Sequence, residues 1–256
     1  MKKSIFILVT SFIGLGLMPA SAQFGPPGGA PQGPRFDGAM DKLLGANQTF
    51  SATLEFQTTE RRGENITMPG KLSFDNGKSR FEMNMSETKG TKMPPDAAEQ
   101  LKSMGMDTMI SISRPDKKTI CMIYPGLHSY AEMPAPDAAA KSDPADSKIE
   151  TTEIGKETVD GHSCVKNKVT VTDKDGTKHE STVWNASDLK NFPIKIITTE
   201  QGQNSTMLYR NISFTKPAAS SFEAPNGFTK YDNIQTMMQT EIMKKMGGGM
   251  GMPSSQ

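Results

Sequence analysis

Apolar and polar residues alternate along much of the chain, which is typical of β-strands with one buried face. In the stretch TFSATLEFQT, residues Phe50, Ala52, Leu54 and Phe56 recur at every second position and therefore point to the same side of a strand. The same alternation runs through residues 111–133, with breaks at two proline-containing turns. The pattern predicts a protein built mainly of strands, each with an apolar side that must be covered.

Short turn motifs separate the alternating segments. Asn76-Gly77 favours a tight hairpin turn because both residues accept a positive φ. Asp160-Gly161 predicts a second hairpin, and residues 173–176 and 201–204 predict two more. Residues 114–117, Arg-Pro-Asp-Lys, favour a type I turn because proline fixes φ at the second position. Turns at this short spacing indicate antiparallel strands, not alternating strands and helices.

Two helices are expected among the strands. Residues 94–105 open with prolines, contain good helix formers and end at a glycine. Residues 232–247 begin with the candidate N-cap Asp232 and carry Ile and Met near helical spacing. Pro125-Gly126 is expected to bend a strand where the sheet curves. Together these elements predict a mainly β (α+β) fold: a curled antiparallel sheet forming a half-barrel, capped by two short helices.

The first 22 residues have the pattern of a signal peptide. Two lysines precede an apolar stretch over residues 5–18, and Ala20-Ser21-Ala22 fits the small-x-small rule, so cleavage is expected after Ala22. The alternative is a retained membrane anchor, but the apolar run is short for a bilayer span and no stop-transfer cluster follows it. The mature protein is therefore expected to be periplasmic or secreted, without a transmembrane segment.

The remaining sequence divides into a linker, one domain and a tail. Residues 23–37 are rich in Gly and Pro and predict a flexible linker. Residues 38–246 are numerous enough for a single core and predict one β domain, interrupted by an exposed loop at about 134–148. Residues 247–256 predict a disordered tail rich in Gly and Met.

Charge and motif content exclude several classes of function. The chain has 29 basic and 28 acidic residues, and two of the basic residues lie in the predicted signal peptide. This balance argues against nucleic acid or an anionic membrane as an electrostatic partner. The sequence also lacks G-x-S-x-G, H-E-x-x-H and phosphate-loop motifs, so neither a catalytic residue nor a cofactor is predicted.

Four blocks of sequence stand out: GMDTMISISRPDKKTICMIYPGLHSYAEM, ETVDGHSCVKNKVTVTDKDG, VWNASDLKNFPIKI and SFEAPNGFTKYDN. They resemble a family of secreted bacterial proteins catalogued as a domain of unknown function, over most of residues 45–245. That family is similar in layout to the periplasmic lipoprotein carriers, the LolA, LolB and LppX-like proteins. The resemblance implies a LolA-like half-barrel, capped by helices, that holds acyl chains. It also implies that Arg80, Phe81 and residues 192–196 lie in strands comparable to those of the carriers.

The chain has two cysteines, Cys121 and Cys164, and an even number in an oxidising compartment allows a disulfide. Closing that loop would contribute roughly 4 kcal/mol on the loop-entropy model. The alternative is two separate buried thiols in neighbouring strands. The sequence leaves both open, because it does not place the two Cα atoms within bonding range.

The sequence gives only weak support to two kinds of metal site, one for zinc and one for copper. Cys121, His128, His162 and Cys164 could form a zinc site, but their spacing is not that of a zinc signature, and His162 is better explained as a turn-flanking residue. Nineteen methionines could bind Cu(I), especially in the tail. Methionine more commonly fills irregular apolar interiors and adaptable binding surfaces. No metal site is therefore predicted, and Trp184 is expected in the core.

The sequence favours a non-enzymatic binding or carrier module whose curled sheet shelters an acyl chain or another apolar ligand. One alternative is a structural or protein-interaction domain of the cell envelope with a solid core and no ligand. A second alternative is a Met-rich Cu(I)-binding envelope protein. The ligand-binding residues are not predicted individually.

Overall fold

The structure is a computed structural model that describes residues 38–59, 65–90, 96–135, 148–172, 176–200 and 203–247. The predicted signal peptide and linker, most of the predicted loop at 134–148, and the tail beyond Gly247 lie outside the described residues. Those predictions therefore stay predictions.

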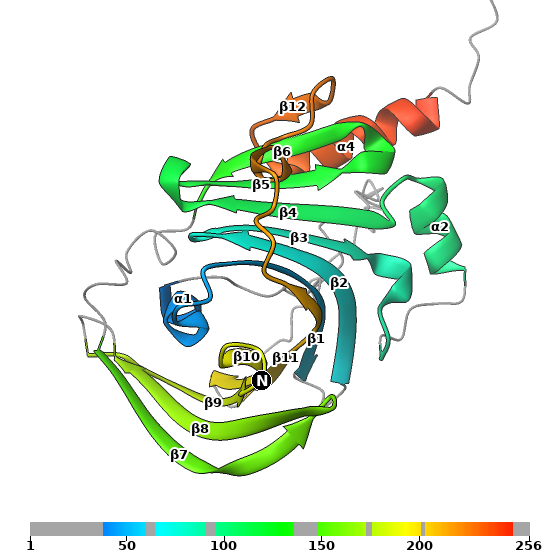
Figure 1. The fold of residues 1–256 in the computed structure, drawn as a ribbon. Coiled ribbons are helices and arrows are strands. Elements are labelled where there is room, and N and C mark those ends of the chain that lie inside the picture. Colours follow the sequence, from blue (N-terminus) through cyan, green and yellow to red (C-terminus); the bar gives the residue numbers. More distant parts are fainter. Residues whose placement is uncertain are drawn as a thin grey trace, which may run out of the picture. The chain divides into compact units, whose positions relative to one another are not determined.

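Strands of the described residues form one twelve-stranded sheet in the order β12-β6-β5-β4-β3-β2-β1-β11-β10-β9-β8-β7 (Figure 1). The strand bounds are β1 Thr49–Thr59, β2 Asn65–Asp75, β3 Lys78–Asn84, β4 Thr108–Arg114, β5 Thr119–Tyr124, β6 Ser129–Pro134, β7 Lys148–Val159, β8 His162–Thr172, β9 Lys178–Ala186, β10 Phe192–Glu200, β11 Gln203–Ser213 and β12 Thr229–Tyr231.

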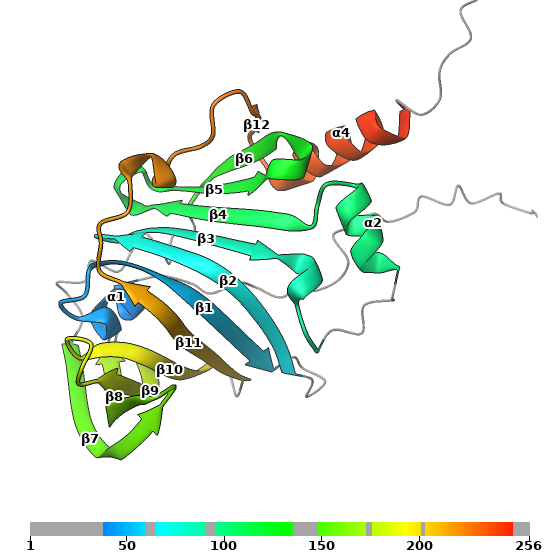
Figure 2. The ribbon, with the colours of Figure 1, turned by 45° about the vertical axis from the view of Figure 1, so that its right-hand side comes forward.

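The sheet consists of two meanders joined at its middle. Strands β1 to β6 follow one another in space, as do β7 to β11, and β1 pairs with both β2 and β11. All neighbours are antiparallel except β12 with β6. The sheet is curled, most strongly in the half formed by β7 to β11 (Figures 1 and 2). The predicted fold class, a curled antiparallel half-barrel with short helices, is confirmed.

Two of the predicted hairpin turns are confirmed, whereas residues 173–175 and 201–202 of two others lie outside the described residues. Asn76 and Gly77 have φ values of 49° and 80°, and Asp160 and Gly161 have 48° and 84°, as the predicted turns require. Pro125-Gly126, however, does not bend a continuous strand. It belongs to the 3-10 turn η3 (Pro125–Leu127), which ends β5 and starts β6. Proline has no N–H for the ladder, so the strand stops there.

The predicted helices are present, but the helix that packs inside the curl is a third one. Helices α2 (Ala97–Ser103) and α4 (Ile234–Gly247) lie within the predicted segments, yet α2 has no buried residue. Helix α1 (Gly38–Leu44), which the sequence did not predict, lies against β8 and β10 inside the curl. Its seven residues are too few to show a helical period.

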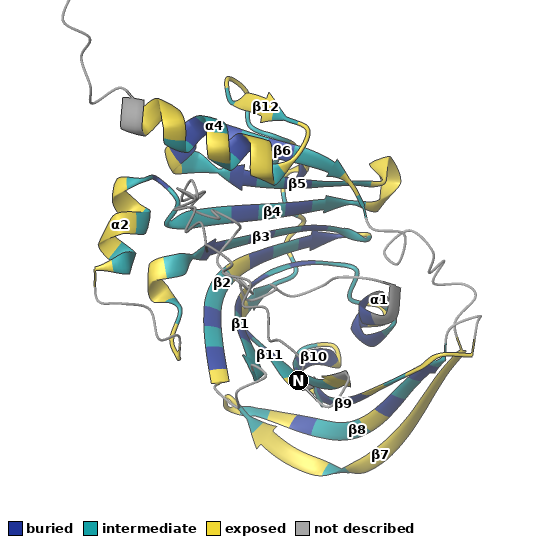
Figure 3. Cartoon of the chain, turned by 180° about the vertical axis from the view of Figure 1, so that it is seen from behind, coloured by how far each residue is buried: buried dark blue, intermediate teal, exposed yellow. Residues whose placement is uncertain are grey.

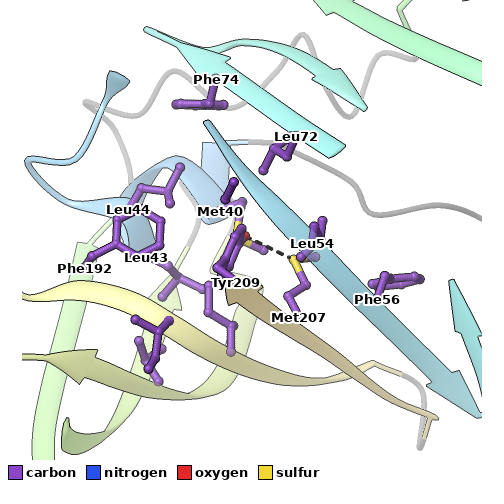
Figure 4. Packing of buried hydrophobic residues seen from close by; sticks show 14 of the residues in the cluster. Met40, Leu43, Leu44, Leu54, Phe56, Leu72, Phe74, Phe192, Met207 and Tyr209 are labelled. Carbon is purple, nitrogen blue, oxygen red and sulfur yellow. Dashed lines mark hydrogen bonds between the residues drawn. The ribbon is translucent and has the colours of Figure 1, made fainter. Parts of the chain in front are cut away.

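We call the side of the sheet that bears Phe50 and Leu54 and contacts α1 the inner face, and the opposite side the outer face. Figure 4 shows α1 packed on the inner face. The ring of Phe50 lies 5.6 Å from that of Phe74, 4.8 Å from that of Phe192 and 6.1 Å from that of Tyr209. All four are at most 1% exposed. From α1 the cluster receives Met40, Leu43 and Leu44. The inner face is therefore filled by side chains where α1 lies.

A second, smaller cluster lies on the outer face of β4 and β5. It consists of Ile110, Ile112, Cys121 and Ile123, covered by Phe222 of the 3-10 turn η5 (Ala219–Phe222). Arg114 holds this cover in place: it donates a 3.1 Å hydrogen bond to the Phe222 carbonyl and forms ion pairs with Asp116 and Glu223. Because β4 and β5 are buried on their outer face, they do not need a helix on their inner face for stability.

The two outer edges of the sheet differ in length and composition. Strand β12 has three residues, whereas β7 has twelve, ten of them exposed. Strand β7 carries Lys148, Glu150 and a bulge at Gly155, and no described strand pairs with its outer edge. Figure 3 shows β7 as the most exposed of the long strands.

Leu44→Ala should destabilise the protein by about 2–5 kcal/mol, because it leaves a cavity in the inner-face cluster. The matched change Leu101→Ala in α2, where no residue is buried, should cost less than half as much. Urea unfolding monitored by circular dichroism measures both. Equal losses in the two variants would show that α1 does not fill the inner face.

Candidate functional site

The inner face continues from β1 to β6 through the strand register. Phe81 of β3 lies opposite Ser111 of β4, Ser111 lies opposite Met122 of β5, and Met122 lies opposite Ala131 of β6. Directly paired residues of antiparallel strands point to the same side. Residues of β4 and β5 at these positions therefore extend the face that α1 covers elsewhere.

Burial changes sides between β3 and β4. In β3 the inner-face residues Ser79, Phe81 and Met83 are buried, whereas in β4 and β5 the buried residues point outward. The inner-face residues of β4 and β5 are all partly exposed; we call this surface the inner strip, and it consists of Met109, Ser111, Ser113, Ile120, Met122 and Tyr124. Thioether, aliphatic and aromatic groups with small hydroxyls suit contact with an apolar molecule.

Helix α4 borders the inner strip. Met237 of α4 is fully buried, as are Ser129 and Ala131 on the inner face of β6. The Ser129 hydroxyl donates a hydrogen bond of 3.0 Å to Glu241 Oε1, so α4 packs on the same face as the strip. Figure 3 shows the buried side of α4 turned toward β5 and β6.

The polar contact between α4 and the sheet centres on Glu241, which is 8% exposed. Its Oε1 accepts hydrogen bonds from Ser129, from the Tyr231 hydroxyl at 2.6 Å and from Lys244 Nζ at 2.9 Å. Burial alone would raise the pKa of Glu241, but these three hydrogen bonds outweigh it and lower the pKa. The carboxylate is therefore ionised at neutral pH and held at the edge of the strip.

The C-terminal part of α4 also bonds to the segment that precedes β4. Lys245 Nζ donates a 2.8 Å hydrogen bond to the Met104 carbonyl. Gly105 and Gly126 touch beside it, and a Cβ on Gly126 would lie 2.6 Å from the Gly105 Cα. Only glycine allows this approach, which brings the β5–β6 turn against the α2–β4 connection.

A separate hollow of about 210 Å³ lies at the end of α1 and is lined by Ala46, Asn47, Gln48, Thr49, Lys190 and Phe214. Lys190 Nζ stands 4.7 Å from the centre of the Phe214 ring. Its lining is mainly polar, unlike that of the inner strip, so the hollow is not suited to an acyl chain.

The two cysteines are free and lie in different clusters. Cys121 is buried on the outer face with Ile112 and Phe222, whereas Cys164 of β8 is buried with the α1 side of the core. The disulfide that the sequence allowed is thus absent, because β5 and β8 are separated by seven strands in the sheet order. Burial raises the pKa of Cys121 to about 11, so this thiol is protonated and unreactive at neutral pH.

The four residues considered for zinc do not come together. His162 Nδ1 lies 2.7 Å from Asp188 Oδ2 beside the β7–β8 turn, and the ring of His128 lies 4.6 Å from that of Phe228. Among the described residues, no group of three or more His, Cys, Asp or Glu side chains is placed to hold a metal ion. The methionines of the tail, considered for Cu(I), lie outside the described residues.

Trp184 is in the core, as predicted, with 4% of its surface exposed. Its indole Nε1 donates a 2.9 Å hydrogen bond to Glu157, and the Nζ atoms of Lys195 and Lys166 lie 4.5 Å and 4.9 Å from the ring. These contacts occupy the ring, which leaves no open aromatic platform for a ligand.

Residues 50–192 match the model of the family described as Domain of unknown function (DUF4412). The chain belongs to this family. The match spans more than half of the chain and confirms the family resemblance, although the block at residues 221–233 lies beyond the matched region. A search of curated proteins finds no match for this DUF4412 protein.

Several solved structures are similar to this DUF4412 protein at low sequence identity. A LolA superfamily protein from Nitrosomonas europaea is 10% identical with a TM-score of 0.42, and the alignment covers 72% of this chain and 94% of that one. Lipoprotein LppX from Mycobacterium tuberculosis is 9% identical with a TM-score of 0.41, covering 71% and 96%. At such scores the likeness says nothing of what the DUF4412 protein binds.

In the part of the chain that the structure describes, no helix is long and apolar enough to cross a membrane.

Glu241→Gln should lower the free energy of unfolding at pH 7 by about 1–3 kcal/mol, because three donors then lose a charged acceptor. A carboxylate whose pKa is lowered by folding stabilises the protein above its unfolded pKa of about 4.3, and this contribution is lost as the pH falls through the folded pKa. The difference between wild type and variant should therefore shrink toward pH 3. Urea titrations at both pH values measure it.

The matched control is Glu99→Gln on α2, where the carboxylate is exposed. This variant should unfold like the wild type at both pH values. If Glu241→Gln behaved in the same way as Glu99→Gln, the hydrogen bonds to Glu241 would not hold α4 on the sheet.

Proposed function

We propose that this protein is a non-enzymatic binding or carrier module, periplasmic or secreted, that holds an acyl chain or another apolar ligand on the inner strip. The observation that carries the proposal is the change of buried side between β3 and β4. Where α1 lies, the inner face is closed by side chains; across β4 and β5 it keeps apolar groups partly exposed.

The strip is long enough for a chain-like ligand. Strands β4 and β5 have seven and six residues, and at about 3.3 Å per residue each spans roughly 20 Å. A ligand lying there would gain about 25 cal/mol for each Å² of apolar surface removed from water. The strip residues bury apolar surface and supply no acid–base pair, which fits binding without chemistry.

The outer side of the two strands that carry the strip is well packed, which supports a preformed surface. Ile112 and Ile123 on the outer face are 1% exposed beneath Phe222, and Arg114 fixes the Phe222 backbone. Binding to a surface that is already ordered costs less conformational entropy than binding to a loop. The inner strip would therefore accept a ligand without rearrangement of the sheet.

A structural or protein-interaction domain of the envelope, without a ligand, is the second candidate. The observation that favours it is the filling of the inner face by Met40, Leu43 and Leu44 of α1. This candidate requires that the strip bind nothing. Copper handling by the Met-rich tail remains a third prediction; deletion of residues 246–256 should then abolish Cu(I) binding.

The protein purified from its native envelope should release lipid into organic solvent, detected by mass spectrometry. The delipidated protein should bind a fluorescent fatty acid or an uncharged probe such as diphenylhexatriene. If the extract held no lipid and neither probe bound, the structural candidate would replace this proposal.

Met122→Glu should reduce probe binding at least tenfold, because it places a charge on the inner strip. Thr119→Glu is the matched control, since Thr119 is partly exposed on the same strand but points to the outer face. It should bind the probe as the wild type does. Thermal melts show whether both variants are folded. Equal binding by both variants would place the ligand elsewhere.

A further inference from the structure

We propose that the inner strip ends in a site for the head group of an amphiphile, formed by Tyr124 and Glu241, and that this site selects heads that donate hydrogen bonds, an ammonium or a hydroxyl. The inference rests on the proposed function and adds the class of ligand. In this arrangement the apolar chain of the ligand would lie along β4 and β5, and its polar head would lie against α4.

The register brings the two residues to one end of the strip. Tyr124 is the last residue of β5 and lies directly opposite Ser129, the first residue of β6. The Ser129 side chain points to the inner face and donates its hydrogen bond to Glu241. Tyr124 is therefore the cross-strand neighbour of Ser129 and Glu241 is its hydrogen-bond partner, both on the face that carries Met122.

The hydrogen bonds of Glu241 leave half of its carboxylate available. Ser129, Tyr231 and Lys244 all donate to Oε1. Among the described residues no donor reaches Oε2, and this oxygen is open to solvent, because the one buried side-chain N or O atom without a partner in that part of the chain is Thr88 Oγ1. The three hydrogen bonds to Oε1 fix the orientation of the carboxylate, so the accessible Oε2 is already placed to accept one more.

Tyr124 supplies the complementary group. Its side chain is partly exposed, and within the described part of the chain its hydroxyl has no hydrogen-bond partner. Burial raises the pKa of its phenol, so the hydroxyl keeps its proton and can donate. A hydroxyl head could thus donate to Glu241 and accept from Tyr124, whereas an ammonium head would pair with the Glu241 charge.

The charge of Glu241 sets the selectivity. Its lowered pKa keeps the carboxylate ionised at neutral pH, and it would repel a carboxylate or phosphate head. Lys244 neutralises part of this charge through its bonds to Oε1 and the Tyr231 hydroxyl, and Lys245 donates to the Met104 carbonyl; neither lysine makes a hydrogen bond to Oε2. The site therefore offers a carboxylate oxygen to the head group, unlike a pocket built from cationic side chains.

The alternative is that Glu241 only fastens α4 to β6. That role needs Ser129, Tyr231 and Lys244, all of which use Oε1, and it makes no demand on Oε2 or on Tyr124. Stability measurements alone cannot separate the two roles, because Glu241→Gln changes both. Discrimination among head groups separates them.

The experiment compares three ligands with the same twelve-carbon chain: dodecylamine, dodecanol and dodecanoate. Each displaces diphenylhexatriene from the full mature chain at pH 7. The wild type should bind the amine and the alcohol about tenfold more tightly than dodecanoate, the effect of one charge-assisted hydrogen bond. Glu241→Gln should lose about tenfold for the amine and should not weaken binding of dodecanoate.

Tyr124→Phe provides a second test that leaves the α4 contact intact. It should weaken dodecanol several-fold and affect the amine less, and Glu99→Gln should change none of the three affinities. Thermal melts confirm that each variant is folded; if Glu241→Gln is not, Tyr124→Phe and the wild-type selectivity decide. Equal binding of the three ligands by the wild type overturns the head-group site and leaves the proposed function standing. Failure of all three to displace the probe overturns the proposed function itself.

Discussion

The packing of α1 against the aromatic cluster around Phe50 is the contact on which the rest of the sheet depends. Strand β1 joins the two meanders, and its inner side would expose Phe50, Ala52 and Leu54 if nothing covered them. The four rings and the three apolar residues of α1 close this surface. The curl of β7 to β11 follows, because these strands must bend around a seven-residue helix.

That closure is local, and the short length of α1 explains the second half of the structure. Seven helical residues extend only about 10 Å, far less than the width of a twelve-stranded sheet. Beyond β3 the chain uses another solution: η5 crosses the outer face and buries Ile112 and Ile123 there. Once the outer side is sealed, the inner side of β4 and β5 no longer has to be buried for stability. The apolar side chains of the inner strip are therefore left partly exposed.

The sequence predicts the sheet well because its signals are local. Alternation at Phe50 to Phe56 and the turn residues Asn76-Gly77 act over two to ten residues, and the structure confirms both. Helix α1 escaped prediction because a helix this short is stabilised by tertiary contacts and not by its own period. The side on which β4 and β5 are buried also escaped it, since Phe222 lies about a hundred residues away and alternation is the same whichever side is covered. Glu241 carried no motif; only its three donors, from three separate elements, make it notable.

The two edges of the sheet have a consequence for the behaviour of the protein at high concentration. A three-residue strand such as β12 is too short to template another chain, and charged residues with a bulge make a long edge such as β7 a poor one. A half-open sheet with an apolar interior would otherwise be prone to grow by adding strands from its neighbours. Both edge strands discourage that growth, so the protein can keep a partly exposed apolar inner face without polymerising through its sheet edges.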